Sequence, residues 1–246
     1  ERLLETPSLA VSQCKNVTRK MIELAKEGIN TALSLISEYS EESFSFVKEC
    51  EDKTDKYEDL LGSYLVKLTQ KDLSTADSRE VSELLHLIGD IERMGDHALN
   101  IAEAAEEINE KKIKFTGDAE MELETLANAT KEIVSLSISA FDNNDTNAAV
   151  MIEPLEQVID NLKITLKSNH VKRLQEGRCS IETGFVFSDI VTNCERISDH
   201  CSNVSVYIMQ RGKDSIGGHE YLTEFKLTSD LFREQVAEYS KKYSVQ

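Results

Sequence analysis

Apolar residues recur at steps of three and four along most of this chain, which is the spacing that places side chains on one face of an α-helix. The longest such stripe extends over residues 81–108 and lasts for about eight helical turns. Similar stripes, bounded by capping residues, glycines or polar pairs, indicate further helices. The helices predicted in this way cover about residues 7–37, 40–70, 81–108, 117–136, 146–177, 180–210 and 220–242.

The order of these predicted helices repeats itself, since three helices are followed by three that resemble them. We therefore expect an all-α fold of two tandem three-helix bundles plus a C-terminal helix that docks on the second bundle. The expected boundaries are a linker at 1–7, the first bundle at 8–112, the second bundle at 113–211 and the C-terminal helix at 219–243. Pro154 falls inside the fifth predicted helix, where its missing N–H predicts a kink or a delayed start.

Composition supports this class and limits the partners. The 246 residues include two prolines, ten glycines and no tryptophan, and 40% are hydrophobic, which favours long helices around a buried core. A formal net charge of −17 opposes binding to nucleic acids or anionic lipids and favours cations. Five cysteines without a CxxC pair suggest reduced thiols and the cytosol. No stretch is apolar enough to span a membrane, but the sequence begins at Glu1, so we expect a piece of a longer protein with membrane segments upstream.

One short segment occurs twice. ERMGDHALN at 92–100 returns as ERISDHCSN at 195–203, with a constant offset of 103 residues. Each copy contains a Glu and an Asp four residues apart, which places two carboxylates on neighbouring turns of one helical face. The second helix of each half adds another pair with this spacing, at an offset of 105 residues. The four pairs are Glu92 with Asp96, Glu195 with Asp199, Glu51 with Asp55, and Glu156 with Asp160.

If the second and third helices of each half lie side by side, up to four carboxylates converge there. Oxygen-only ligand sets suit hard cations such as iron, manganese, magnesium or calcium. We therefore treat these eight residues as candidate metal ligands, with iron, manganese, zinc or magnesium as candidate cofactors. However, a chain with 45 Asp and Glu contains many acidic pairs by chance. Glu92 lies about 100° from Ile91 on a helical wheel, so a solvated face is the simpler alternative.

The basic residues of the repeated segment have structural explanations. Arg93 and Arg196 are expected to donate to ion pairs within a helix or between the bundles. His97 and His200 could bind a metal, but a histidine that bonds to a neighbouring helix is the more common case. The repeat alone does not separate these roles.

No catalytic constellation is present in the sequence. Glu83 and His86 have the ExxH spacing of di-iron bundles, but the second half has Val186 and Asp189 at the corresponding positions. There is no glycine-rich phosphate loop, no GxSxG elbow and no Cys-His nucleophile pair. We therefore expect a protein that is not an enzyme.

Two segments resemble a known family. GDIERMGDHALNIAEAAEEI at 89–108 resembles the signature helix of PhoU-like domains, and TNCERISDHCSNVSVYI at 192–208 resembles its second copy. The resemblance covers most of residues 8–210 and implies two three-helix bundles related by a pseudo-two-fold axis. In some members it also implies multinuclear clusters of iron or other metals, held by E(D)xxxD pairs. The matching pairs here are Glu92 with Asp96 and Glu195 with Asp199, and less closely Glu51 with Asp55 and Glu156 with Asp160.

The second copy departs from the family pattern. Asp90, which precedes Glu-Arg in the first copy as is common in the family, becomes Asn193 in the second copy. The lost charge is expected to make the second acidic cluster weaker or different. Pro154, close to Glu156, adds a further difference in that half.

The ends of the chain narrow the functional expectation. The opening ERLLETPSLA and the additional C-terminal helix look more like the cytoplasmic tail of bacterial sodium/phosphate cotransporter family proteins. This implies a cytoplasmic regulatory domain of a sodium-dependent phosphate transporter of the inner or plasma membrane, which modulates uptake or signals phosphate status. Expected partners are the transmembrane portion of the same chain, a regulatory protein and a second copy, with no nucleic acid. Alternatives are a free-standing PhoU-type regulator that binds a transporter and a sensor kinase, a metal-dependent enzyme or metal store of carboxylate-bundle type, and an interaction scaffold.

Overall fold

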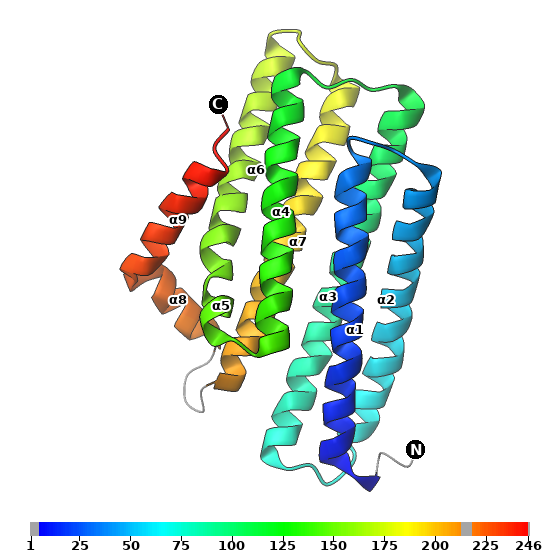
Figure 1. Cartoon of the computed structure of the whole chain (residues 1–246), viewed down its shortest axis with the longest axis vertical. Coiled ribbons are helices and arrows are strands. Elements are labelled where there is room, and N and C mark those ends of the chain that lie inside the picture. Colours follow the sequence, from blue (N-terminus) through cyan, green and yellow to red (C-terminus); the bar gives the residue numbers. More distant parts are fainter. Residues whose placement is uncertain (1–4, 213–217, 246) are drawn as a thin grey trace.

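The computed structural model describes residues 5–212 and 218–245, which contain helices and no strand (Figure 1). The predicted all-α class is therefore confirmed. Most of the expected linker at 1–7 lies outside the described residues, and the first helix begins at Pro7. The helices are α1 (Pro7–Leu35), α2 (Glu41–Leu68), α3 (Thr75–Lys111), α4 (Gly117–Asn143), α5 (Thr146–Val150), α6 (Ile152–Gln175), α7 (Ile181–Gly212), α8 (Gly218–Thr228) and α9 (Asp230–Lys242).

Capping side chains define where the helices of the first half begin. The Ser40 hydroxyl accepts a hydrogen bond from the backbone N–H of Ser43 at the start of α2, as its sequence predicts. The Ser74 hydroxyl does the same for the N–H of Asp77, so α3 begins at Thr75, before its apolar stripe. These caps satisfy donors that the first helical turn leaves without an internal partner.

The helices form two bundles of three. Helices α1, α2 and α3 pack against one another, as do α4, α6 and α7, and the bundles meet mainly along α3 and α7 (Figure 1). One continuous cluster of buried apolar residues fills both bundles, and its largest fully buried side chains include Phe141, Phe187 and Met21. The two tandem bundles agree with the prediction. Because α3 and α7 carry the repeated segment, its two copies face each other where the bundles join.

The fifth predicted helix has a delayed start, which was one of the two outcomes expected from Pro154. Asp145 caps the five-residue helix α5, and the chain resumes as α6 at Ile152. Pro154 is therefore in the first turn of α6, where a missing N–H leaves no helical bond unmade. The restart places Glu156 and Asp160 on a regular helix.

The C-terminal part contains two helices, so the single helix expected at 219–243 is wrong. The break falls at Ser229, whose hydroxyl accepts from the N–H of Phe232 at 3.3 Å and caps α9. Helices α8 and α9 lie along the second bundle, with α8 against α7 and α9 against α6 (Figure 1). The expected docking is thus confirmed. None of the described helices combines the length and the apolar character that crossing a membrane requires.

Candidate functional site

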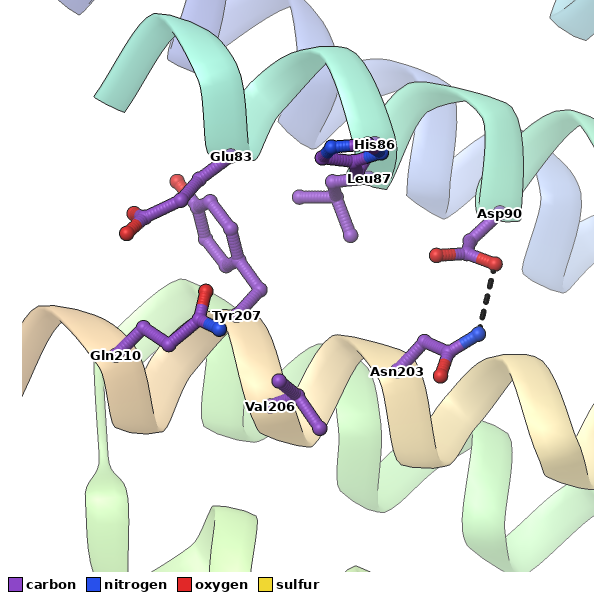
Figure 2. A pocket seen from close by; sticks show the side chains of 8 residues that line it. All are labelled: Glu83, His86, Leu87, Asp90, Asn203, Val206, Tyr207 and Gln210. Carbon is purple, nitrogen blue, oxygen red and sulfur yellow. Dashed lines mark hydrogen bonds between the residues drawn. The ribbon is translucent and has the colours of Figure 1, made fainter. Parts of the chain in front are cut away.

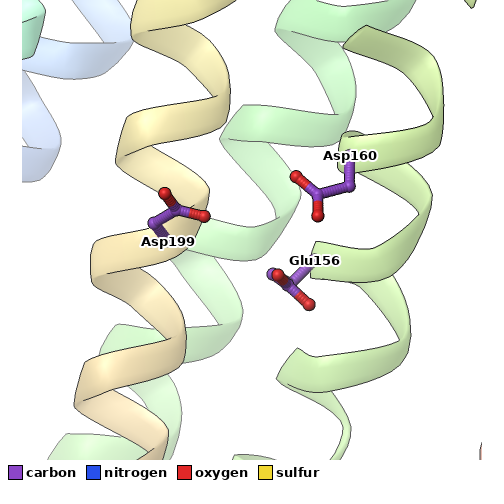
Figure 3. A group of neighbouring side chains, drawn as sticks. All are labelled: Glu156, Asp160 and Asp199. Carbon is purple, nitrogen blue, oxygen red and sulfur yellow. The ribbon is translucent and has the colours of Figure 1, made fainter. Parts of the chain in front are cut away.

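Three of the predicted carboxylates converge in the second bundle. Glu156 and Asp160 project from α6 toward Asp199 on α7 (Figure 3), and one carboxylate oxygen of each lies within 4.8 Å of the other two. All three side chains are partly buried. Oxygens bound to one cation at about 2.0–2.6 Å are separated by at most about 5 Å, so this spacing suits a single shared ion.

Glu195, the fourth predicted residue of this half, is buried beside the three. Its Oε1 lies 2.5 Å from Nζ of Lys163 on α6. Its Oε2 is buried without a hydrogen-bond partner in the described residues, 3.8 Å from Nε of Arg196. Arg196 itself donates to Asp199 at 3.1 Å, the intrahelical ion pair expected from the sequence. An unsatisfied carboxylate oxygen at this depth costs free energy, and a bound cation would remove that cost.

A fifth carboxylate, which the sequence analysis missed, extends this site. Glu153 is buried at the start of α6 and accepts a hydrogen bond of 2.6 Å from Ser202 on α7. Lys226 of α8 places its Nζ 2.8 Å from Glu153 and 3.0 Å from Glu156. The signal for Glu153 was available, since Glu153, Glu156 and Asp160 follow the i, i+3, i+7 spacing of one helical face. We call Glu153, Glu156, Asp160, Glu195 and Asp199 the second acidic group.

Burial and mutual repulsion both act on these carboxylates. Burial raises the pKa of Glu156 to about 6, with Lys226 opposing and Glu153 and Asp160 adding to the shift. The pKa of Asp160 and that of Asp199 are also raised, first by burial and then by the charge of Glu195. When burial and neighbouring negative charges oppose the ionisation of a carboxylate, a bound cation stabilises its charged form most strongly.

The first bundle brings its predicted carboxylates together less tightly. Glu51 and Asp55 on α2 face Glu92 and Asp96 on α3, and we call these four the first acidic group. Burial raises the pKa of Glu51 and that of Glu92, and in both the charge of Asp96 is the next cause. In the described chain, no three of these carboxylates share the close spacing found in the second bundle, and none of the four makes an ion pair. Asp55 is exposed and the others are partly buried.

Gly95 allows the close approach of α2 and α3 beside the first group. A Cβ at this position would lie 2.7 Å from Oγ1 of the buried Thr54, a distance that real side chains do not adopt. The corresponding residue in the second copy is Ser198, which is buried in α7. A side chain is therefore accommodated at this position in the second bundle, whereas in the first bundle it would collide with Thr54.

The other residues of the repeated segment join the two bundles. His200 Nδ1 lies 2.9 Å from Oδ1 of Asp90, and Asn203 donates to the same oxygen at 2.9 Å. The mirror set has the same form, with His97 Nδ1 2.8 Å from Oδ1 of Asn193 and Asn100 donating to that oxygen at 3.2 Å.

The rings of His97 and His200 stack between these two sets, with centroids 5.6 Å apart. Both histidines thus bond to the opposite bundle, as expected for the commoner of their two roles. The expectation that Asn193 makes the second acidic cluster weaker or different stays a prediction, since Asn193 bonds to His97 and Asn100 of the other bundle. Asp90 and Asn193 lie in the interface between α3 and α7, where each accepts bonds from the other bundle.

The discounted ExxH pair lines a cleft in this interface. Glu83 and His86 of α3 face Asn203 and Gln210 of α7 across a volume of about 390 Å³ (Figure 2). The Asp90–Asn203 bond closes one end of the cleft (Figure 2). These residues belong to neither acidic group, and in the described chain they do not form a three-ligand set.

The donor chemistry of the second acidic group fits a hard cation. All its ligands are carboxylates, one oxygen is buried without a partner, and two lysines already compensate part of the charge. Oxygen-only sets of this kind suit magnesium, manganese, iron or calcium better than soft metals. Glu156, Asp160 and Asp199 are the residues that would hold the ion, with the buried carboxylate of Glu195 beside them.

Comparisons with known proteins point to one family. The model of a family described as the PhoU domain matches residues 18–105 and 123–208, one match in each bundle. A curated Thermotoga maritima protein, phosphate-specific transport system accessory protein PhoU homolog 1, is 27% identical over 203 residues, which is 81% of this chain and 87% of that protein. The Clostridium acetobutylicum homologue of the same description is 21% identical over 75% of this chain and 84% of its own length.

Solved structures show the same fold. The crystal structure of PhoU from Pseudomonas aeruginosa superposes with a TM-score of 0.78 at 19% identity, covering 84% of this chain and 99% of that one. The phosphate transport system regulatory protein PhoU from Streptococcus pneumoniae superposes with a TM-score of 0.74 at 18% identity, covering 85% and 97%. Helices α8 and α9 follow the last residue of the family match.

Proposed function

The chain belongs to the PhoU domain family, and from this premise we propose that it is a non-catalytic regulator of phosphate transport. The observation that carries the proposal is the family match in both bundles, together with curated relatives described as accessory proteins of phosphate-specific transport. A regulator of this kind acts by contact with a transport protein at the cytoplasmic face of the membrane. No part of the proposal requires a reaction at the acidic groups.

Of the two forms of this function expected from the sequence, we favour the accessory protein. The relatives that carry this description are matched over 87% and 84% of their own length, so the likeness extends over nearly the whole of a protein with that role. A domain fused to a sodium-dependent transporter stays a prediction. Both forms share the same proposed partner, a membrane component of phosphate uptake.

We further propose that the second acidic group binds a divalent cation. The convergence of Glu156, Asp160 and Asp199, and the unpartnered oxygen of Glu195, support this part. Manganese, magnesium and iron fit the all-oxygen set, and zinc fits it less well. A bound ion would neutralise the group and hold α6 and α7 together.

The regulatory proposal is tested by deleting the gene in its natural host. Uptake of radiolabelled phosphate is measured at low and high external phosphate, in the deletion strain and after complementation with the intact chain. We expect the deletion to uncouple uptake from external phosphate, and complementation to restore the response. An unchanged response in the deletion strain would contradict the proposal.

A further inference from the structure

Helix α8 brings a cation into the second acidic group from outside the matched family region. The family match ends at residue 208, and α8 spans Gly218–Thr228. Lys226 of α8 bridges Glu153 and Glu156 at 2.8 and 3.0 Å, with 32% of its side chain exposed. Leu222 is buried on the same helix. The appended segment therefore docks by an apolar contact and by one partly buried ion-pair bridge.

The three basic residues at this group come from three different helices. Lys163 pairs with Glu195 and Arg196 pairs with Asp199, both from the helices α6 and α7 that build the group. Among the described residues, Lys226 is the basic residue that pairs with Glu156, one of the three carboxylates that share the close spacing, and it comes from a separate helix. A carboxylate oxygen cannot serve an ammonium group and a divalent cation equally at once, and the two positive charges repel at this distance.

We propose that Lys226 is a tethered competitor of the divalent cation, so that a cation bound at Glu156, Asp160 and Asp199 displaces its ammonium group and loosens α8. This inference rests on the metal-binding part of the proposed function. It assigns α8 the role of reporting cation occupancy on the outer surface of the second bundle. The acidic group would then be linked to a surface that a partner protein can sense.

The loosening is expected to stay within α8. Helix α9 has its own anchor at its far end, where Lys242 lies 2.6 Å from Glu132 of α4 and the Tyr243 hydroxyl donates to the same carboxylate. The helix break at Ser229 separates the two segments. Loss of the Lys226 bridge thus leaves α9 bound, whereas α8 keeps the apolar contacts of buried Leu222 and of Phe225, whose ring packs against Phe232 of α9.

The test uses the intact chain, purified without a metal-binding tag and stripped with chelator. Manganese(II) alone is titrated by calorimetry, and hydrogen exchange of peptides from α8 and α9 is followed by mass spectrometry with and without manganese. The variants are Lys226→Met, the control Lys242→Met, and the double variant Asp160→Asn with Asp199→Asn. Lys242→Met makes the same charge change on the same appended segment but breaks the pair with Glu132.

We expect Lys226→Met to bind manganese about fivefold more tightly than the unmodified chain, as removal of one competing ion pair predicts, and Lys242→Met to bind as the unmodified chain does. Manganese should speed exchange in α8 and leave α9 unchanged, and the double variant should show neither effect. If manganese binds and the double variant abolishes binding, but Lys226→Met and α8 exchange show no change, the inference is overturned and the cation site stands. If neither the unmodified chain nor Lys226→Met binds manganese, the cation site and the inference both fall. Binding by Lys226→Met alone would support the inference in its strongest form.

Discussion

The two acidic groups occupy equivalent positions in the two bundles but differ in how their charge is compensated. In the second bundle, Glu153 and Glu195 are buried, and Lys163, Arg196 and Lys226 pair with members of the group. In the first bundle the four carboxylates are more open, and in the described chain none of them has an ion-pair partner. Solvent therefore screens the first group, whereas the second depends on cations that the protein itself supplies.

The same contrast appears where the bundles meet. His200 and Asn203 of the second copy bond to a carboxylate, Asp90, whereas His97 and Asn100 of the first copy bond to an amide, Asn193. A duplicated segment thus keeps its geometry while one acceptor has lost its charge. Of these two sets, the one that bonds to Asp90 has charge-assisted bonds, which are the stronger kind. The two halves therefore have similar sequences, but their bonds across the interface differ in strength.

The largest expected effect is a difference between the two acidic groups in manganese binding. Asp160→Asn with Asp199→Asn removes two of the three converging carboxylates and should weaken the tightest manganese binding by more than about 100-fold. The matched change in the first bundle, Asp55→Asn with Asp96→Asn, should leave that tightest site intact. Titration calorimetry of stripped protein measures both. A greater loss in the first-bundle variant would reverse the comparison.

A smaller effect concerns the internal counter-charge of the second group. Lys163→Met leaves the buried Glu195 with Nε of Arg196 at 3.8 Å as its remaining ion-pair contact, and we expect it to lower the free energy of unfolding by about 3 kcal/mol, as for other broken buried pairs. Lys53→Met in the first bundle breaks the exposed pair with Glu49 at 2.6 Å and should leave the free energy unchanged within error. Urea unfolding in the presence of chelator gives both values. Equal losses in the two variants would show that burial does not determine how much an ion pair stabilises this fold.

The next effect tests the interface. His97→Ala and His200→Ala each remove the stacked ring contact, but only His200→Ala also leaves the Asp90 carboxylate without its imidazole partner. We expect His200→Ala to cost about 2 kcal/mol of unfolding free energy and His97→Ala about 1 kcal/mol. Asp90→Asn, which gives both halves the same acceptor, should remove the difference. If the difference persists in the Asp90→Asn background, the charge of Asp90 is not its cause.

Much of this fold follows from local sequence signals. Helical periodicity and the doubled segment predict the two bundles, and Pro154 predicts either a kink or a delayed start of its helix, of which the structure has the delayed start. The break between α8 and α9 also had a signal, since Ser229 followed by Asp230 is a typical helix start. The apolar stripe continues from α8 into α9 across this cap, so helical periodicity alone does not reveal the break.

The interface and the counter-ions could not be predicted in the same way. Asp90, His97 and Asn100 follow an i, i+7, i+10 stripe, distinct from the face of Glu92 and Asp96, so a second functional face of α3 was visible. What that face meets depends on how α3 packs on α7, which no local spacing encodes. Lys226 reaches Glu156 from 70 residues further along the chain, and such pairing depends on tertiary packing alone.

The smallest expected effect is the response of the two groups to pH. The pKa of Glu156 is raised from 4.5 to about 6 in the folded chain, so the folded state binds this proton more tightly than the unfolded state does. Its contribution to stability is therefore complete below about pH 4.5 and is lost as the pH rises through about 6. Glu156→Gln has no ionisable carboxyl group at this position, so its stability does not fall in this way as the pH rises.

Relative to the unmodified chain, Glu156→Gln should therefore gain about 1 kcal/mol of unfolding free energy between pH 4.5 and pH 7, a value below that of a rigid site because solvent screens part of the shift. Glu51→Gln, the corresponding change in the first bundle, should gain less, because Glu51 lies in the more open group. Urea unfolding of both variants at the two pH values, with chelator present, measures the difference. If Glu51→Gln gains as much as Glu156→Gln, the deeper burial of the second group does not control its ionisation.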